Sequence, residues 1–207
     1  MKKLMKPLLI LTTFILSTNL WANFRIPNNF HMDFIQVIKS EISGKVRKSK
    51  GHIDYKYPGQ IRFKVEDKVS SIFISNTHTQ WYYTPPFIEG EQGEVRISKN
   101  HKNILTDLFD IIKKYGEKKN KHYEIVKIST KQKLIKFLPE SENKLDAKSL
   151  ELFFNKESGQ FDHVNKFIIE YTDKRKVTFE VLSLDLNKTF GKDHFSFTVP
   201  PNTKIVR

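Results

Sequence analysis

The sequence predicts a mainly β protein, in which one antiparallel sheet of about eleven strands curls into an unclosed barrel under a helical lid. Aromatic residues, which favour strands, make up 13% of the chain, and 17 of them are Phe. From Phe30 onward, short segments of alternating apolar and polar residues are separated by turn residues. A single segment has helical spacing. Because one helix is too narrow to cover so wide a sheet, the sheet is expected to curl.

Six strands are expected in the first half of the chain. In the third of them, Ile61, Phe63 and Val65 alternate with charged residues, which is the clearest period of two in the sequence. Pro58-Gly59 precedes this strand as a turn signal, and Pro85-Pro86 stops a later strand. The six strands cover residues 30–36, 53–57, 61–66, 69–75, 80–84 and 95–97.

The segment from His101 to Tyr115 is the expected helix. Lys113 and Lys114 lie in its last turn and Gly116 follows, as is typical of a helix C-terminus. Its apolar residues fall on one side at helical spacing, which indicates an amphipathic helix that covers a core. These residues are Ile104, Leu105, Leu108, Ile111, Ile112 and Tyr115.

Five further strands are expected in the second half. They cover residues 123–129, 133–138, 150–155, 162–171 and 177–186, with a polar loop at 139–148. Short extended segments at 195–197 and 205–206 close the chain.

Residues 1–22 are expected to be an export signal. Lys2, Lys3 and Lys6 precede an apolar run from Leu8 to Leu16, and Ala22 is a suitable last residue before cleavage. The apolar run is too short for a transmembrane span of ~20 residues. Residues 23–207 then form a single domain in the periplasm.

The chain is strongly basic, with a formal net charge of +13 at pH 7. Removal of three lysines with the signal leaves 13 − 3 = +10. Such a charge favours a membrane surface or an acidic protein as partner, although a well-solvated lysine-rich exterior also accounts for it. Nucleic acid is not expected as a partner of an exported protein.

No pattern of residues points to catalysis, a metal or a cofactor. The chain has no cysteine, and its seven histidines lack the spacing of a helical zinc motif. A glycine-rich phosphate loop and a Gly-x-Ser-x-Gly elbow are also absent from the sequence. We therefore expect a binding protein rather than an enzyme.

Four motifs, in this order, resemble those of the LolA family of periplasmic lipoprotein carriers. The first, at residues 30–36, is similar to an opening Phe-x-x-x-Phe-x-Gln strand. The second runs from Gly51 to Pro58 and resembles the family's Gly-x-x-x-x-Lys-Arg-Pro turn. The third, at residues 72–85, includes Trp81-Tyr82-Tyr83-Thr84-Pro85, and the fourth, at residues 195–201, resembles a closing Phe-x-Phe-x-x-Pro. Together they span nearly all of residues 23–207.

The resemblance implies an unclosed barrel with a helical lid over an apolar cavity. It also implies that the protein receives acylated lipoproteins from an inner-membrane ABC transporter and delivers them to the outer-membrane receptor LolB or an equivalent. Such a carrier is expected to act as a monomer. Two departures stand out: Tyr57 replaces the arginine that closes the lid in the family, and residues 23–29 leave little room for the family's N-terminal helix.

These expectations assign roles to individual residues. Tyr57 is the candidate latch of the lid. The inner face of the lid is expected at Leu105, Leu108 and Ile112. The wall of the lipid cavity is expected at Ile61, Phe63, Val65, Ile72, Ile74, Trp81 and Tyr83.

Alternative functions remain open at this point. The lipid-sensing domain of periplasmic stress regulators shares the fold, but such proteins usually carry a second domain. The receptor LolB carries a lipidation cysteine, which this chain lacks. A protein that binds anionic lipid or peptidoglycan through its basic surface is the remaining alternative, and its binding would weaken as salt is added.

Overall fold

A computed structural model describes residues 24–40, 43–67, 70–99, 104–157 and 159–206. The expected export signal and its cleavage after Ala22 lie outside these residues.

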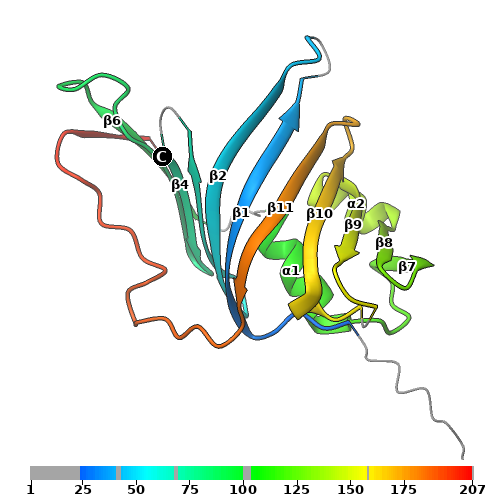
Figure 1. Cartoon of the computed structure of the whole chain (residues 1–207). Helices are drawn as coiled ribbons and strands as arrows, with labels where there is room; N and C mark the ends of the chain where they lie inside the picture. The colour runs from blue at the N-terminus through cyan, green and yellow to red at the C-terminus, as the bar shows by residue number, and fades with distance from the viewer. Residues whose placement is uncertain (1–23, 41–42, 68–69, 100–103, 158, 207) are drawn as a thin grey trace, which may run out of the picture.

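The described residues form one sheet of twelve strands, in the order β12-β6-β5-β4-β3-β2-β1-β11-β10-β9-β8-β7. All neighbours are antiparallel except β12, which is parallel to β6. Figure 1 shows the sheet as a continuous curved wall, with β11 returning beside β1. The strands are β1 (Asn29–Lys39), β2 (Val46–Lys56), β3 (Gln60–Glu66), β4 (Ser71–Asn76), β5 (Thr79–Thr84), β6 (Gly93–Lys99), β7 (Tyr123–Ser129), β8 (Gln132–Phe137), β9 (Ala147–Phe154), β10 (Val164–Tyr171), β11 (Lys176–Asp185) and β12 (Thr203–Val206).

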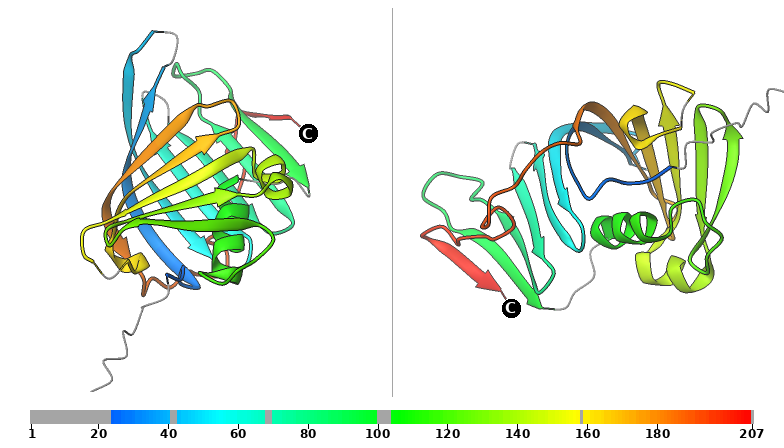
Figure 2. Two further views of the ribbon diagram at one scale, coloured as in Figure 1. Left: turned by 90° about the vertical axis from the view of Figure 1, so that its right-hand side faces the viewer. Right: turned by 90° about the horizontal axis from the view of Figure 1, so that it is seen from below.

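The sheet does not close, because its edge strands β12 and β7 are not paired with each other. Seen from below, the wall curves around a helix that lies within it (Figure 2). The predicted architecture, an unclosed barrel with a helical lid, is therefore confirmed.

Two α-helices and one 3-10 turn complete the described elements: α1 (Ile104–Tyr115), α2 (Pro139–Leu145) and η1 (Phe161–His163). Sequence reasoning placed a loop where α2 lies. Pro139 in the first turn, acidic Glu140 and Glu142 beside it and Lys144 in the last turn all favour this short helix. No helix among the described residues is long and apolar enough to cross a bilayer.

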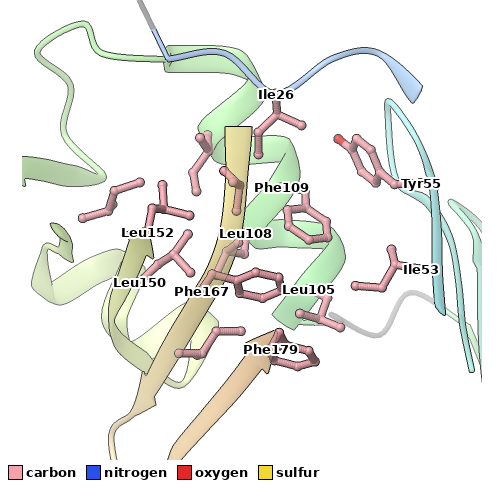
Figure 3. Packing of buried hydrophobic residues seen from close by; sticks show 14 of the residues in the cluster. Ile26, Ile53, Tyr55, Leu105, Leu108, Phe109, Leu150, Leu152, Phe167 and Phe179 are labelled. Carbon is pink, nitrogen blue, oxygen red and sulfur yellow. The ribbon is translucent and has the colours of Figure 1, made fainter. Parts of the chain in front are cut away.

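The main core lies between the helices and the inner face of the sheet, which is the face that α1 covers. Phe30, Met32 and Phe34 of β1 are buried there at 0–1% exposure, while the residues between them face outward. Figure 3 shows α1 side chains meeting side chains from strands on both of its sides. Phe24 and Ile26 before β1 and Leu145 of α2 join the same cluster. As expected, the single helix α1 does not cover this face alone, because these additional segments share the cover.

A smaller hydrophobic cluster lies on the outer face of the sheet. Residues 186–202, which we name the strap, connect β11 to β12 and cross that face. Phe195 of the strap is 4% exposed. Ile74 and Val95 of the sheet are fully buried on this outer face and are not part of the main core. Residues 195–197, expected to be extended, make a turn and a loop rather than a strand.

A polar network fastens the strap to the sheet. The buried carboxylate of Asp54 accepts hydrogen bonds from His31 Nδ1 at 2.6 Å and from His194 Nε2 at 2.7 Å. Arg62 donates from Nη1 to the carbonyl of His194 at 3.1 Å. Because a buried carboxylate needs such donors, these bonds fix the strap across β1, β2 and β3.

Candidate lipid-binding site

Helix α1 presents its apolar side to the inner face of the sheet. Leu105, Leu108 and Ile112 are 6%, 0% and 0% exposed and belong to the main core, as does Phe109. The Phe109 ring packs edge-on against Phe30, with ring centroids 5.4 Å apart. The structure thus places the three predicted lid residues against the sheet, and their contact with lipid stays a prediction.

Described residues pack closely where α1 meets β1, β9 and β10. Among the described residues, an apolar cavity at this place has a volume of about 10 Å³, which is room for roughly one water molecule. Its walls come from the N-terminal segment, α1, η1 and strands β1, β9 and β10: Phe24, Ile26, Met32, Phe109, Leu150, Leu152, Phe161, Val164 and Phe167. An acyl chain can therefore occupy this space only when α1 moves away from the sheet.

Tyr55 and Gly59 hold α1 down through Asp110, and we name these three residues the latch. The Tyr55 hydroxyl donates to Asp110 Oδ1 at 2.6 Å, and the Gly59 amide donates to the same oxygen at 3.2 Å. Burial, followed by the hydrogen bond to Asp110 and the charge of that carboxylate, raises the pKa of Tyr55 well above its usual value. The hydroxyl therefore stays protonated and remains a donor at physiological pH.

Tyr57 was the residue expected to act as latch, and this expectation was wrong. Its side chain is 36% exposed, and the hydrogen bonds from this turn to α1 come from Tyr55 and Gly59. The end of β2 at Lys56 explains the difference. Tyr55 is buried on the inner face, whereas Tyr57 follows the end of the strand in the turn.

The seven residues predicted to form one cavity wall lie on two faces. Phe63 lies opposite Ile53 of β2 and Phe73 of β4, which places it on the inner face with Ile61 and Val65. These three residues belong to the main core or pack against it.

The other four predicted wall residues were assigned to the wrong face. Residues directly opposite in an antiparallel pair share a face, and Ile74 lies opposite both Arg62 and Trp81. Ile72 and Tyr83 are likewise paired on that outer side. A shift of one residue across the β3–β4 and β4–β5 turns reverses the side of every residue, so alternation within each strand could not place them.

Phe73 and Tyr82 are two further aromatic residues of the inner face that were not among the predicted wall residues. They lie opposite each other on β4 and β5, and Tyr82 is 46% exposed. With the half-buried Phe63 they extend the apolar inner face beyond α1. Phe73 lies opposite Phe63, and Tyr82 lies opposite Phe73. This pairing could have identified both residues, but only if the register of the β3–β4 hairpin had been known.

Gly51 is required by close packing on this face. A Cβ at this position would lie 2.6 Å from the Phe34 ring and 2.3 Å from the carbonyl oxygen of Lys64. The glycine of the second motif thus lets the Phe34 ring lie across β2, where it stacks on Phe63 with centroids 5.5 Å apart.

A family model described as outer membrane lipoprotein carrier protein LolA matches residues 27–198. The chain belongs to the LolA family. No curated protein matches the sequence.

Two solved structures are similar to this LolA-family chain over most of its length. A LolA superfamily protein from Nitrosomonas europaea has 8% identity and a TM-score of 0.43, with 83% of this chain and 92% of that chain covered. An outer membrane lipoprotein-sorting protein domain from Vibrio parahaemolyticus has 7% identity and a TM-score of 0.38, with 82% and 89% covered.

Polar clusters elsewhere in this LolA-family chain have structural roles. His122 bonds through Nδ1 to Ser141 Oγ at 3.0 Å and through Nε2 to the Tyr115 hydroxyl at 3.1 Å, which ties the end of α1 to α2. In the part of the chain that the structure describes, no group of three or more His, Asp or Glu side chains is placed to hold a metal ion.

Proposed function

We propose that this protein is an exported periplasmic carrier that shelters the acyl chains of lipoproteins between α1 and the inner face of the sheet. The family to which the chain belongs consists of lipoprotein carriers and is in general periplasmic. One observation carries the proposal most strongly: α1 buries an apolar side against an apolar sheet and is joined to the β2–β3 turn by the latch. Displacement of α1 therefore exposes two facing apolar surfaces.

The energies of the closed and the loaded states are of the same order. Five apolar side chains of α1 are buried: Leu105, Leu108, Phe109, Ile111 and Ile112. Burial of each contributes ~1.5–3 kcal/mol, so the helix is held by on the order of 10 kcal/mol. An acyl chain gains ~0.8 kcal/mol per buried methylene, which gives on the order of 10 kcal/mol for a chain of ordinary length. Helix and acyl chain can thus exchange on the same surface, and no covalent step is needed.

The near balance also suits delivery. A carrier must keep acyl chains out of water and yet release them to a site that holds them better. When cargo leaves, α1 returns to the sheet and restores its own burial, which offsets the loss of lipid contact. We propose the inner-membrane lipoprotein-releasing ABC transporter as donor and LolB or an equivalent as acceptor, with a monomeric, non-catalytic carrier between them.

Native mass spectrometry of the protein isolated from the periplasm tests this function. We expect species heavier than the mature chain by the mass of an acylated lipoprotein, and uptake of a synthetic triacylated lipopeptide by the cargo-free protein. A peptide of the same sequence without acyl chains is the control and should not bind. Equal binding of the two peptides, or no uptake of either, would exclude the carrier function.

A further inference from the structure

The β1–β2 hairpin projects beyond the strands beside it, as Figure 1 shows. Among the described residues, β3 pairs with β2 only as far as Lys50, and β11 pairs with β1 only as far as Ile38. The two hairpin strands continue to pair with each other out to Lys39 and Val46. We name the outer part of this hairpin, as far as the structure describes it (residues 35–40 and 43–50), the arm.

The arm is strongly basic. The described residues of the arm contain no acid, and the one acid between positions 35 and 50 of the sequence, Glu41, lies outside the described residues. Its five cations are all exposed: Lys39, Lys45, Arg47, Lys48 and Lys50.

Few carboxylates border these cations. Arg47 is 3.5 Å from Asp67, and this is the ion pair of the arm among the described residues. Glu66, opposite Lys50, is already bonded to Lys64 at 2.7 Å. Glu180 of β11 faces the arm from the other side, opposite Ile35. The positive charge of the arm is therefore mostly uncompensated within the chain.

The outer face of the arm alternates cations with aliphatic side chains. Lys39 lies opposite Val46, Lys48 opposite Val37, and Lys50 opposite Ile35. Like charges are thus never directly opposite, and each lysine stem has an aliphatic neighbour to pack on. Val46 is nevertheless 56% exposed, so the face offers apolar surface as well as charge.

We propose that the outer face of the arm docks on an anionic lipid bilayer. Ammonium groups spread along a ribbon suit the phosphates of a membrane surface, and the aliphatic side chains between them suit the boundary between headgroups and acyl chains. The face is an open strip of the sheet's outer surface rather than a pocket, with β1 still paired to β11 as far as Ile38, and such a strip fits a planar surface. Docking is independent of the acyl site, because the arm's outer face is the opposite side of the sheet from α1.

Flotation with lipid vesicles tests the proposal. The mature protein is mixed with phosphatidylcholine vesicles that contain or lack phosphatidylglycerol, at low salt and at about 0.5 M salt, where exposed charges are screened within ~4 Å. The arm variant carries Lys39→Gln, Lys45→Gln, Arg47→Gln, Lys48→Gln and Lys50→Gln. The control variant has the same net charge but carries exposed substitutions near the β7–β9 end of the sheet: Lys118→Gln, Lys119→Gln, Lys121→Gln, Lys131→Gln and Lys156→Gln.

We expect binding of the wild type to phosphatidylglycerol vesicles at low salt, loss of that binding at high salt, and a drop of about tenfold or more in the arm variant alone. The proposal would be overturned if the wild type does not bind or if binding drops equally in both variants. It would also be overturned if binding does not depend on salt or on phosphatidylglycerol. Should the arm variant misfold, the triple variant Lys39→Gln, Lys48→Gln and Lys50→Gln replaces it, with the same expected result. Lipopeptide uptake by the arm variant should be unchanged, which separates this test from that of the carrier function.

Discussion

Tyr55, near the end of β2, donates its hydroxyl to Asp110 of α1 across 2.6 Å, and this bond joins the lid to the sheet. The Tyr55 ring also packs edge-on against Phe109 of the same helix, with centroids 5.3 Å apart. One side chain thus supplies both a polar and an apolar contact to the lid. Loosening it should shift α1 toward the displaced state without altering the rest of the fold.

Tyr55→Phe is therefore expected to ease opening of the lid. The variant keeps the ring contact but removes a hydrogen bond to a charged acceptor, which costs about 1.5–3 kcal/mol. Amide hydrogen exchange in α1 should become faster, and triacylated lipopeptide should be taken up faster. Tyr57→Phe is the matched control, because this exposed tyrosine two residues later should change neither rate. Equal effects of the two substitutions would contradict a specific role of the Tyr55 hydroxyl in holding the lid.

The two faces of the sheet can be distinguished by one charge on each. Phe63→Glu places a carboxylate on the inner face, where the ring now stacks on Phe34, and should abolish lipopeptide uptake by a protein that still folds. Ile72→Glu places the same charge on the outer face opposite Lys64 and should leave uptake intact. Circular dichroism and a lipopeptide binding assay measure the two properties. Loss of uptake in both variants would argue against an inner-face site.

His52 should make the protein less stable in mild acid. Burial is the main cause that lowers its pKa below the usual value of 6.5, opposed by the nearby charge of Asp54. The unfolded chain then binds a proton at this residue as the pH falls below about 6.5, whereas the folded chain does so only at lower pH. This contribution to stability is thus present above pH 6.5 and is lost as the pH falls through the folded pKa.

His52→Gln should accordingly flatten the loss of stability between about pH 6.5 and pH 5, measured by urea unfolding. His78→Gln, a change of an exposed histidine in the β4–β5 turn, serves as the control. An unchanged pH profile in His52→Gln would show that other groups govern the acid response.

The strap is expected to contribute stability but not binding. Phe195 is 4% exposed on the outer face and contacts the Phe190 ring, with centroids 5.2 Å apart. Phe195→Ala should destabilise the protein by about 3–5 kcal/mol, because it leaves a cavity over the outer cluster. Lipopeptide uptake below the melting temperature should match that of the wild type. If Phe195→Ala stays folded but no longer binds lipopeptide, the strap would instead contribute to the lipid-binding site.

Most of the fold could be predicted from the sequence, because strands with one buried face alternate visibly. Ile61, Phe63 and Val65 of β3 show this directly, and the apolar spacing and terminal lysines of α1 located the lid. The short α2 was not predicted, since a single proline and a few acids in a polar segment are as typical of a loop.

The site was predicted less well, because its geometry depends on register between strands. Ile74 and Trp81 were placed on the inner face although both lie on the outer one. Nothing in the sequence pattern around Asp54 predicts a special role for it. It is nevertheless the buried centre of the strap network, 23 residues from His31 and 140 from His194. The latch likewise joins residues 55 apart. Such contacts arise only when the sheet has curled.

The central claim is that α1 leaves the inner face when acyl chains enter. Because the chain has no native cysteine, Lys114→Cys on α1 and His78→Cys in the β4–β5 turn can carry two spin labels without competing thiols. Double electron–electron resonance should show the label distance shifting when triacylated lipopeptide is added, and unchanged with the non-acylated peptide. Lipopeptide that binds tightly while the distance distribution stays the same would contradict the account.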